Sequence, residues 1–292
     1  MPIESSVSRP KVSILSSSYN HVQFLDAFIE SVYAQTYTNF ELLMLDDGSK
    51  DGSGDLLMEL SQKYDFKAFK RENKGFPNAL NTLRRQATGD YIVIIASDDL
   101  MTPDRLENQV NALENHPKAA LVCGDMQEID ENDSLGNLIS NPLSSVHQFE
   151  QIICSKTYVL APTVMIRKSS LDQVGAYDEN LKVEDFDMWL RLAQHFDFLY
   201  LNQCFAYYRI HSGNSHGNLK VLFEQKEKVL AKYKDSELGK KALQEHYLHA
   251  FLSTARLKSA QDLARYYKSK VNVQCSKAYL SAYLKYYFFP KH

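Results

Sequence analysis

The chain has 292 residues, of which 44% are hydrophobic and 24% charged, and its formal net charge is −3. This composition is typical of a soluble globular protein, and a chain of this length can bury a sizeable core. Its longest apolar runs, such as residues 91–96, are too short to cross a bilayer. The N-terminus lacks a secretory signal, and the four cysteines lie far apart, so we expect a cytoplasmic protein with free thiols.

The charge is distributed unevenly along the chain. Residues 1–218 contain 18 Lys and Arg against 30 Asp and Glu (net −12), whereas residues 219–292 contain 15 against 6 (net +9). The acidic part argues against nucleic acid as the main partner. The change in charge and composition predicts two regions, 1–217 and 218–292.

The first 125 residues alternate short apolar runs with helical patterns. Strands are predicted at 12–15, 41–45, 66–69, 91–96 and 119–123, and helices at 24–33, 56–64, 78–87 and 105–115. This alternation predicts an α/β fold with a mostly parallel sheet flanked by helices on both faces.

The second half of the chain changes character twice. Residues 126–157 are polar and rich in turn formers, and we interpret them as a long connection of the kind that often carries function. Strands at 158–166, 198–201 and 204–208 and a helix at 183–194 follow. From residue 219 onward only helices are predicted, at 219–234, 238–256, 259–270 and 276–288, which gives an all-α C-terminal extension.

Ser97-Asp98-Asp99 follows the apolar run at 91–96 directly. Ligands bind at the carboxyl edge of open α/β sheets, and paired carboxylates there suit a hard divalent cation. The alternative is a structural turn before a helix, because Thr102-Pro103-Asp104 resembles a helix start.

Two other strand ends carry polar residues as well. Residues 16–20 (SSSYN) close the first strand, and residues 46–53 (DDGSKDGS) close the second. Each segment could simply be a turn between a strand and the following helix, with Asn20 or Ser53 as the helix N-cap. Three polar strand ends in succession instead favour a nucleotide site.

The ordered set of these motifs resembles the nucleotide-sugar transferases of glycosyltransferase family 2, which have the GT-A (Rossmann-like) fold. The matching segments are 12–20 (VSILSSSYN), 31–37 (SVYAQTY), 45–53 (LDDGSKDGS), 89–92 (GDYI), 97–99 (SDD), 175–179 (GAYDE) and 184–190 (EDFDMWL). The resemblance covers residues 12 to about 210. It implies that residues 1–217 form a GT-A transferase domain.

The resemblance implies roles for individual residues. Ser17, Tyr19 and Asp47 would contact the donor nucleoside, Asp98 the ribose or sugar, and Asp99 the metal. The family motif usually reads Asp-x-Asp, whereas Ser97 stands at its first position here. The resemblance implies two further contacts: Lys74 would lie near the phosphates, and His211 at the metal or diphosphate. For each of them the alternative is a plain surface residue without a role. His216 is a weaker candidate than His211.

Asp185 matches the general base of the family. The spacing of Phe186, Trp189, Leu190 and Ala193 predicts a buried helix face, with Trp189 in the core. Asp185 would then lie at the exposed first turn, where the helix dipole favours an ionised carboxylate. Helix capping alone is the structural alternative.

The resemblance thus implies an inverting glycosyltransferase that moves a hexose-type sugar from a nucleoside diphosphate donor, expected to be a UDP-sugar, to a hydroxyl of a glycan or lipid-linked saccharide. The expected cofactor is a divalent metal, Mn²⁺ or Mg²⁺. The alternatives are a catalytically silent nucleotide-sugar-binding module that scaffolds polysaccharide assembly, and a nucleotidyltransferase. The last would need a glycine-rich loop after the first strand, and residues 16–20 contain no glycine.

The predicted helix 276–288 is basic and carries an aromatic stripe. Such a helix can lie in a membrane interface, which would place the protein at the inner face of the cell membrane. Packing onto its own core or onto a partner subunit is the favoured alternative.

Overall fold

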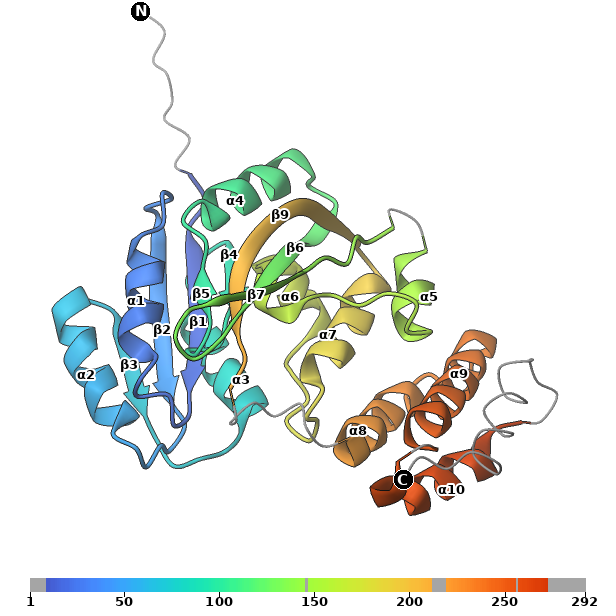
Figure 1. The fold of residues 1–292 in the computed structure, drawn as a ribbon. Coiled ribbons are helices and arrows are strands. Elements are labelled where there is room, and N and C mark those ends of the chain that lie inside the picture. The colour runs from blue at the N-terminus through green and yellow to red at the C-terminus, as the bar shows by residue number, and fades with distance from the viewer. Residues whose placement is uncertain (1–8, 145–146, 212–218, 256, 273–292) are drawn as a thin grey trace, which may run out of the picture. The chain divides into compact units, whose positions relative to one another are not determined.

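The computed structural model describes residues 9–144, 147–211, 219–255 and 257–272. The chain divides into two compact units (Figure 1). The first comprises Met1–Gln148 and Tyr158–Asn214, and the second comprises Phe149–Thr157 and Ser215–His292. The amphipathic helix predicted at 276–288 lies outside the described residues.

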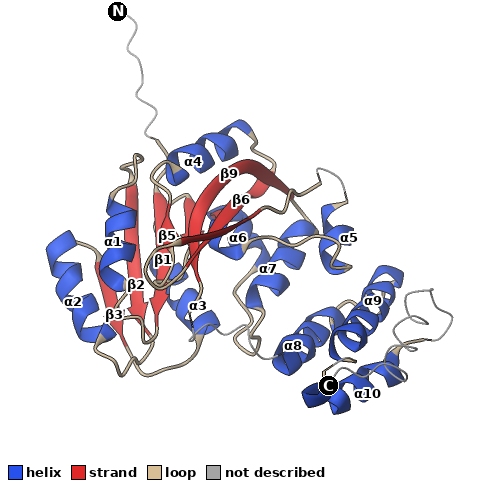
Figure 2. Ribbon diagram, viewed as in Figure 1, coloured by secondary structure: helices blue, strands red, loops and turns tan. Residues whose placement is uncertain are grey.

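The first unit is built on one sheet, whose first four strands are parallel. They are β1 (Val12–Ser18), β2 (Phe40–Asp46), β3 (Lys67–Lys70) and β4 (Tyr91–Ile94). Beyond β4 the sheet is mixed, with β5 (Leu100–Met101), β6 (Ala119–Ile129), β7 (Leu135–Ile139), β8 (Met165–Arg167) and β9 (Asp197–Arg209). The spatial order is β3-β2-β1-β4-β8-β6-β9-β5, with β7 paired to β6. Figure 2 shows the strands of this sheet in red. The predicted α/β class is confirmed.

Helices cover both faces of the parallel strands. One hydrophobic core joins α1 (Leu25–Tyr33), α2 (Ser53–Tyr64) and α4 (Arg105–Asn115) to alternate strand residues such as Val12, Ile14 and Met44. On the other face α3 (Phe76–Gln86) packs against β1 and β2. The period of two along each strand separates the two cores, because successive side chains point to opposite faces.

Three segments differ from the predicted elements. The strand predicted at 158–166 is reduced to β8, because Pro162, inside the 3₁₀ turn η1 (Ala161–Thr163), has no N–H for a sheet. The connection at 126–157 contains the end of β6, the strand β7 and the helix α5 (Gln148–Ile153). The strands predicted at 198–201 and 204–208 form one strand, β9, whose register against β6 shifts beside Gly124.

Two helices follow β8 in the first unit. They are α6 (Lys168–Val174), which the sequence pattern missed, and α7 (Glu184–Ala193), which it predicted. Trp189 and Leu190 of α7 are buried as expected, whereas Phe186 is half-buried.

The described part of the second unit is helical. It contains α8 (Leu219–Ala231), α9 (Glu237–Thr254), the turn η3 (Lys258–Ala260) and α10 (Gln261–Lys270). Its core includes Phe223, Phe251 and Tyr267. Within this unit Glu150 of α5 pairs with Lys241 of α9 at 3.4 Å. Among the described helices, none is both long enough and apolar enough to cross a membrane.

Candidate active site

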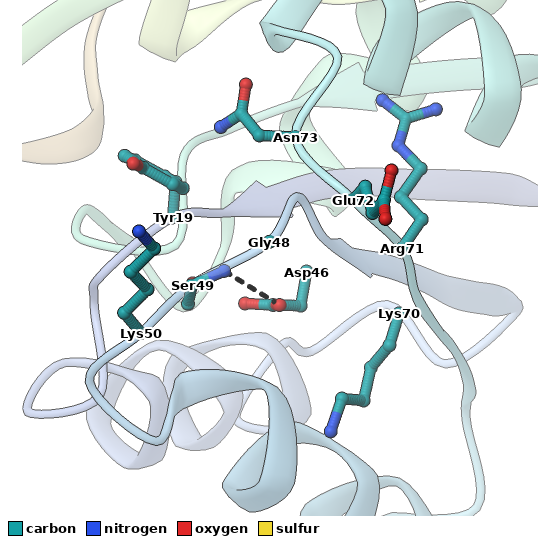
Figure 3. A pocket seen from close by; sticks show the side chains of 9 residues that line it. All are labelled: Tyr19, Asp46, Gly48, Ser49, Lys50, Lys70, Arg71, Glu72 and Asn73. Atoms are coloured by element: carbon teal, nitrogen blue, oxygen red, sulfur yellow. Dashed lines mark hydrogen bonds between the residues drawn. The ribbon is translucent and has the colours of Figure 1, made fainter.

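The ends of β1 and β2 form a pocket at the carboxyl edge of the sheet. Ser18 pairs with Asp46 in the last register position of these strands, so the loops that follow them start side by side. The pocket has a volume of about 630 Å³ and is lined by Tyr19, Asp46, Gly48, Ser49, Lys50, Lys70, Arg71, Glu72 and Asn73 (Figure 3). Tyr19 is 47% exposed, which leaves its ring open to a ligand. Its predicted stacking on a base therefore fits the geometry.

Asp47 lies beneath this pocket and fixes the loop that forms one wall. Its carboxylate accepts from Arg71 Nε at 2.7 Å and from the backbone N–H groups of Lys74 and Gly75, at 3.2 and 2.8 Å. The side chain is almost fully buried. The predicted nucleoside contact of Asp47 stays a prediction, and in this structure its two oxygens serve the loop at 71–75.

Asp46 is a pocket residue for which the sequence suggested no separate role. Its Oδ1 accepts the backbone N–H of Ser49 at 3.2 Å (Figure 3), while the buried Oδ2 has no hydrogen-bond partner among the described residues. A buried acceptor without a donor is costly. Asp46 is thus a candidate for receiving a donor group from a nucleoside.

Asp98 lies between two imidazoles. Its Oδ2 is 2.9 Å from His211 Nε2 and 3.6 Å from His21 Nε2. The ligand atoms of these three residues all lie within 4.8 Å of one another, a spacing that a metal ion can bridge. Asp98 is 8% exposed, and its Oδ1 has no hydrogen-bond partner among the described residues. These donor atoms suit a divalent cation.

Asp99 is more deeply placed than Asp98 and lies outside this group. Its Oδ1 accepts the backbone N–H of Arg209 at 2.9 Å. Burial, followed by the charge of Asp98, raises the pKa of Asp99 well above its usual value. Arg209 Nε in turn donates to the carbonyl of Asp98 at 2.7 Å. These two hydrogen bonds hold the loop after β4 against β9. The metal contact predicted for Asp99 stays a prediction, and in this structure Asp98 is the carboxylate that lies beside His211.

Asp185 lies in the first turn of α7, as predicted. Its Oδ1 accepts the backbone N–H of Phe186 at 2.7 Å. The preceding Glu184 is buried, and burial, followed by the charge of Asp185, raises the pKa of Glu184 to about 7.

The remaining predicted residues fall at the same edge. Ser17 is buried one residue before the end of β1, and its carbonyl accepts from Ser97 Oγ at 3.4 Å. Lys74 is exposed on the loop that Asp47 fixes. His216 lies outside the described residues.

Sequence reasoning missed His21 and Arg71. His21 directly follows the 16–20 segment and therefore lies at the same sheet edge as 97–99, which is a signal that could have identified it. Arg71 gave no such signal, because only the fold brings it to Asp47.

Comparison with known proteins decides the family. The sequence model described as Glycosyl transferase family 2 matches residues 13–175. The chain belongs to glycosyltransferase family 2. Over 193 residues this family 2 protein is 34% identical to "Putative glycosyltransferase EpsE" of Bacillus subtilis (strain 168), covering 64% of the chain and 68% of that protein. It is 28% identical to an uncharacterized glycosyltransferase of Rickettsia felis, of which it covers only 33%.

Solved structures show the same fold. S. aureus TarS 1–349 in complex with UDP-GlcNAc superposes with a TM-score of 0.67 at 18% identity, covering 94% of this chain and 80% of TarS 1–349. The mannosyltransferase PcManGT of Pyrobaculum calidifontis, in complex with GDP-Man and Mn²⁺, gives a TM-score of 0.61 at 17% identity, covering 98% and 89%. The GT-A fold inferred from the sequence is confirmed.

Proposed function

We propose that this protein is an inverting glycosyltransferase that moves a hexose-type sugar from a nucleoside diphosphate, UDP in particular, to a hydroxyl of a glycan or lipid-linked saccharide. The observation that carries the proposal is Asp98. It is buried with one unpartnered oxygen beside His211, at the edge of the sheet that also forms the pocket of Tyr19. Neighbours of the same fold bind UDP-GlcNAc and GDP-Man, which supports a nucleotide-sugar donor.

The residues present fit a divalent cation, with Asp98 and His211 as its protein ligands. When bound, such an ion neutralises the charge that develops on a departing diphosphate. In this proposal Asp99 acts indirectly, because it holds the backbone of Arg209, and Arg209 holds the carbonyl of Asp98. The first-turn position of α7 favours an ionised Asp185.

Asp185 is proposed to take the proton of the acceptor hydroxyl. The hydroxyl oxygen then forms a bond to the anomeric carbon as the bond from that carbon to the diphosphate oxygen breaks, and the nucleoside diphosphate leaves with the electron pair. Attack from the opposite face inverts the configuration, so no enzyme nucleophile is needed. Acceptor class, a cytoplasmic site of action and membrane contact through the C-terminal helices remain proposals that rest on the sequence.

Release of nucleoside diphosphate tests the function directly. The full chain is incubated with a panel of UDP- and GDP-sugars, with Mn²⁺ or Mg²⁺ and with EDTA as control. Metal-dependent release of UDP from one donor, accelerated by an acceptor saccharide, is the expected result. Donor binding without release under any condition would favour the catalytically silent binding module instead.

A further inference from the structure

His21 has no role in the proposed transfer, yet it lies in the same cluster as Asp98. Its Nε2 lies 3.6 Å from Asp98 Oδ2, and its ring stands nearly perpendicular to that of His211, with centroids 5.9 Å apart. The side chains of His21 and Asp98 are 17% and 10% exposed, so bulk water has little access to the space between them.

The hydrogen bonds of Ser97 favour one tautomer of His21. Its Nδ1 lies 2.9 Å from Ser97 Oγ, which lies 3.4 Å from the carbonyl oxygen of Ser17. A carbonyl can only accept, so we assign the Ser97 proton to it, and Ser97 Oγ then accepts from Nδ1–H. This leaves an unprotonated Nε2 directed at Asp98.

A lone pair facing a carboxylate oxygen is unfavourable unless a cation lies between them. The unpartnered Oδ1 of Asp98 is a second, independent sign that this buried carboxylate lacks a ligand. Ser97 stands at the first position of the acidic motif and offers no carboxylate, but it orients an imidazole. Such an outer hydrogen bond is the usual way in which a protein fixes a metal-binding histidine.

We propose that His21 is a third protein ligand of the cation, and that the His21–Asp98–His211 set selects a transition-metal dication such as Mn²⁺ or Co²⁺ over Mg²⁺. The inference rests on the proposed function for the presence of a cation. Two imidazole nitrogens and one carboxylate form a donor set that transition metals accept, whereas Mg²⁺ prefers oxygen ligands only and keeps its waters. Ser97 is a positioning residue in this proposal.

Metal binding to the full chain, measured without any sugar nucleotide, tests the role of His21. Calorimetric titration with Mn²⁺ and with Mg²⁺ compares the wild type with His21→Gln and Ser97→Ala, and with His195→Gln as a control at an exposed histidine outside the site. We expect His21→Gln to lose Mn²⁺ affinity by at least about tenfold with little change for Mg²⁺. Ser97→Ala should lose less, and His195→Gln should match the wild type. Unchanged Mn²⁺ affinity in His21→Gln, or equal wild-type affinity for Mn²⁺ and Mg²⁺, would overturn the inference.

A spectroscopic measurement on the unaltered protein guards against variants that do not fold. Electron spin-echo envelope modulation of bound Mn²⁺ should show coupling to two imidazole nitrogens, and a single coupled imidazole would contradict a role for His21. Failure of the inference differs from failure of the proposed function. Metal-dependent UDP release with only one coupled imidazole overturns His21 alone, and two coupled imidazoles without sugar transfer overturn the transferase.

Discussion

Asp185 is the residue on which the chemistry of the proposed transfer depends. Because the proton leaves the acceptor only in the transition state, Asp185→Asn should lower kcat by roughly 10²–10⁴-fold. The donor dissociation constant should stay within about twofold. Steady-state kinetics and calorimetry with the donor measure the two quantities. Normal turnover in this variant would remove the base assignment.

Glu184, at the same end of α7, should make the stability of the folded protein depend on pH. Its pKa is about 7 in the folded protein against an ordinary value of 4.5, so the folded state binds more protons between these values. Its contribution to stability therefore falls as the pH rises from about 4.5 to 7, by up to ~3 kcal/mol. Glu184→Gln should be stabilised relative to the wild type at pH 8 but not at pH 4.5.

Urea denaturation at the two pH values measures this difference, with the exposed Glu30→Gln as control. An equal effect of Glu184→Gln at both pH values would show that the buried carboxyl does not titrate as expected.

The sequence predicted a site made of Ser17, Tyr19, Asp47, Asp98, Asp99 and His211. In the structure Tyr19 lines the pocket and Asp98 lies beside His211, while the roles of all six stay predictions. The sequence alone could not show which of the two carboxylates, Asp98 or Asp99, contacts Arg209 and which lies beside His211. Asp98 and Asp99 are adjacent in the chain, and only the register of β9 brings the backbone N–H of Arg209 to Asp99.

At the level of elements, the loop after β2 depends on a glycine. Gly48 has φ +82°, and an added Cβ would lie 2.7 Å from the backbone nitrogen of Asn73. Gly48→Ala should therefore displace the pocket wall, destabilise the fold by about 1–3 kcal/mol and weaken UDP binding. Gly175→Ala is the matched control, because Gly175 has φ +91° but no heavy atom within 4 Å of an added Cβ.

We expect both variants to be less stable by thermal unfolding, and only Gly48→Ala to lose UDP affinity beyond that effect. Equal UDP binding by the two variants would argue that the loop at 71–75 does not shape the site.

Helix α9 should make the stability of the second unit depend on pH in the opposite direction to the effect of Glu184. His246 is 4% exposed and packs beside Phe223 and Tyr267, with ring centroids 5.9 and 5.7 Å away. Burial lowers its pKa from 6.5 to about 4, so the unfolded chain binds more protons between these values. The second unit should therefore lose up to ~3 kcal/mol of stability as the pH falls from about 6.5 to 4.

His246→Phe keeps a ring in this place and should remove the loss. Hydrogen exchange of α9 amides at pH 4.5 and 6.5 measures it, with the exposed His195→Phe as control. Acid sensitivity of α9 that persists in His246→Phe would assign the effect to other groups.

Strands with a continuous apolar run were predictable, as the consecutive buried residues of β1 and β2 show. The failures have physical reasons. Pro162 interrupts an apolar run that otherwise reads as a strand, and the β6–β7 pairing occurs in a polar segment whose side chains are largely exposed, so it has little hydrophobic pattern.

For the whole molecule, the ordered motifs carried the fold and the family, and those that end at 20, 53 and 99 lie where the chain leaves the sheet. The grouping of Phe149–Thr157 with the C-terminal helices was not visible in the sequence. It depends on contacts between distant segments, such as the rings of Phe149 and Tyr233 with centroids 5.6 Å apart.

In the proposed transfer Asp98 would hold a cation that neutralises the diphosphate of a sugar nucleotide. Calorimetric titration of the full chain with UDP, in Mn²⁺ and in EDTA, tests it on the wild type and on Asp98→Ala. We expect Mn²⁺ to raise the UDP affinity of the wild type at least about tenfold, and to have no effect on the affinity of the variant. UDP affinity that is the same with Mn²⁺ and with EDTA in the wild type, or that still depends on Mn²⁺ in Asp98→Ala, would contradict it.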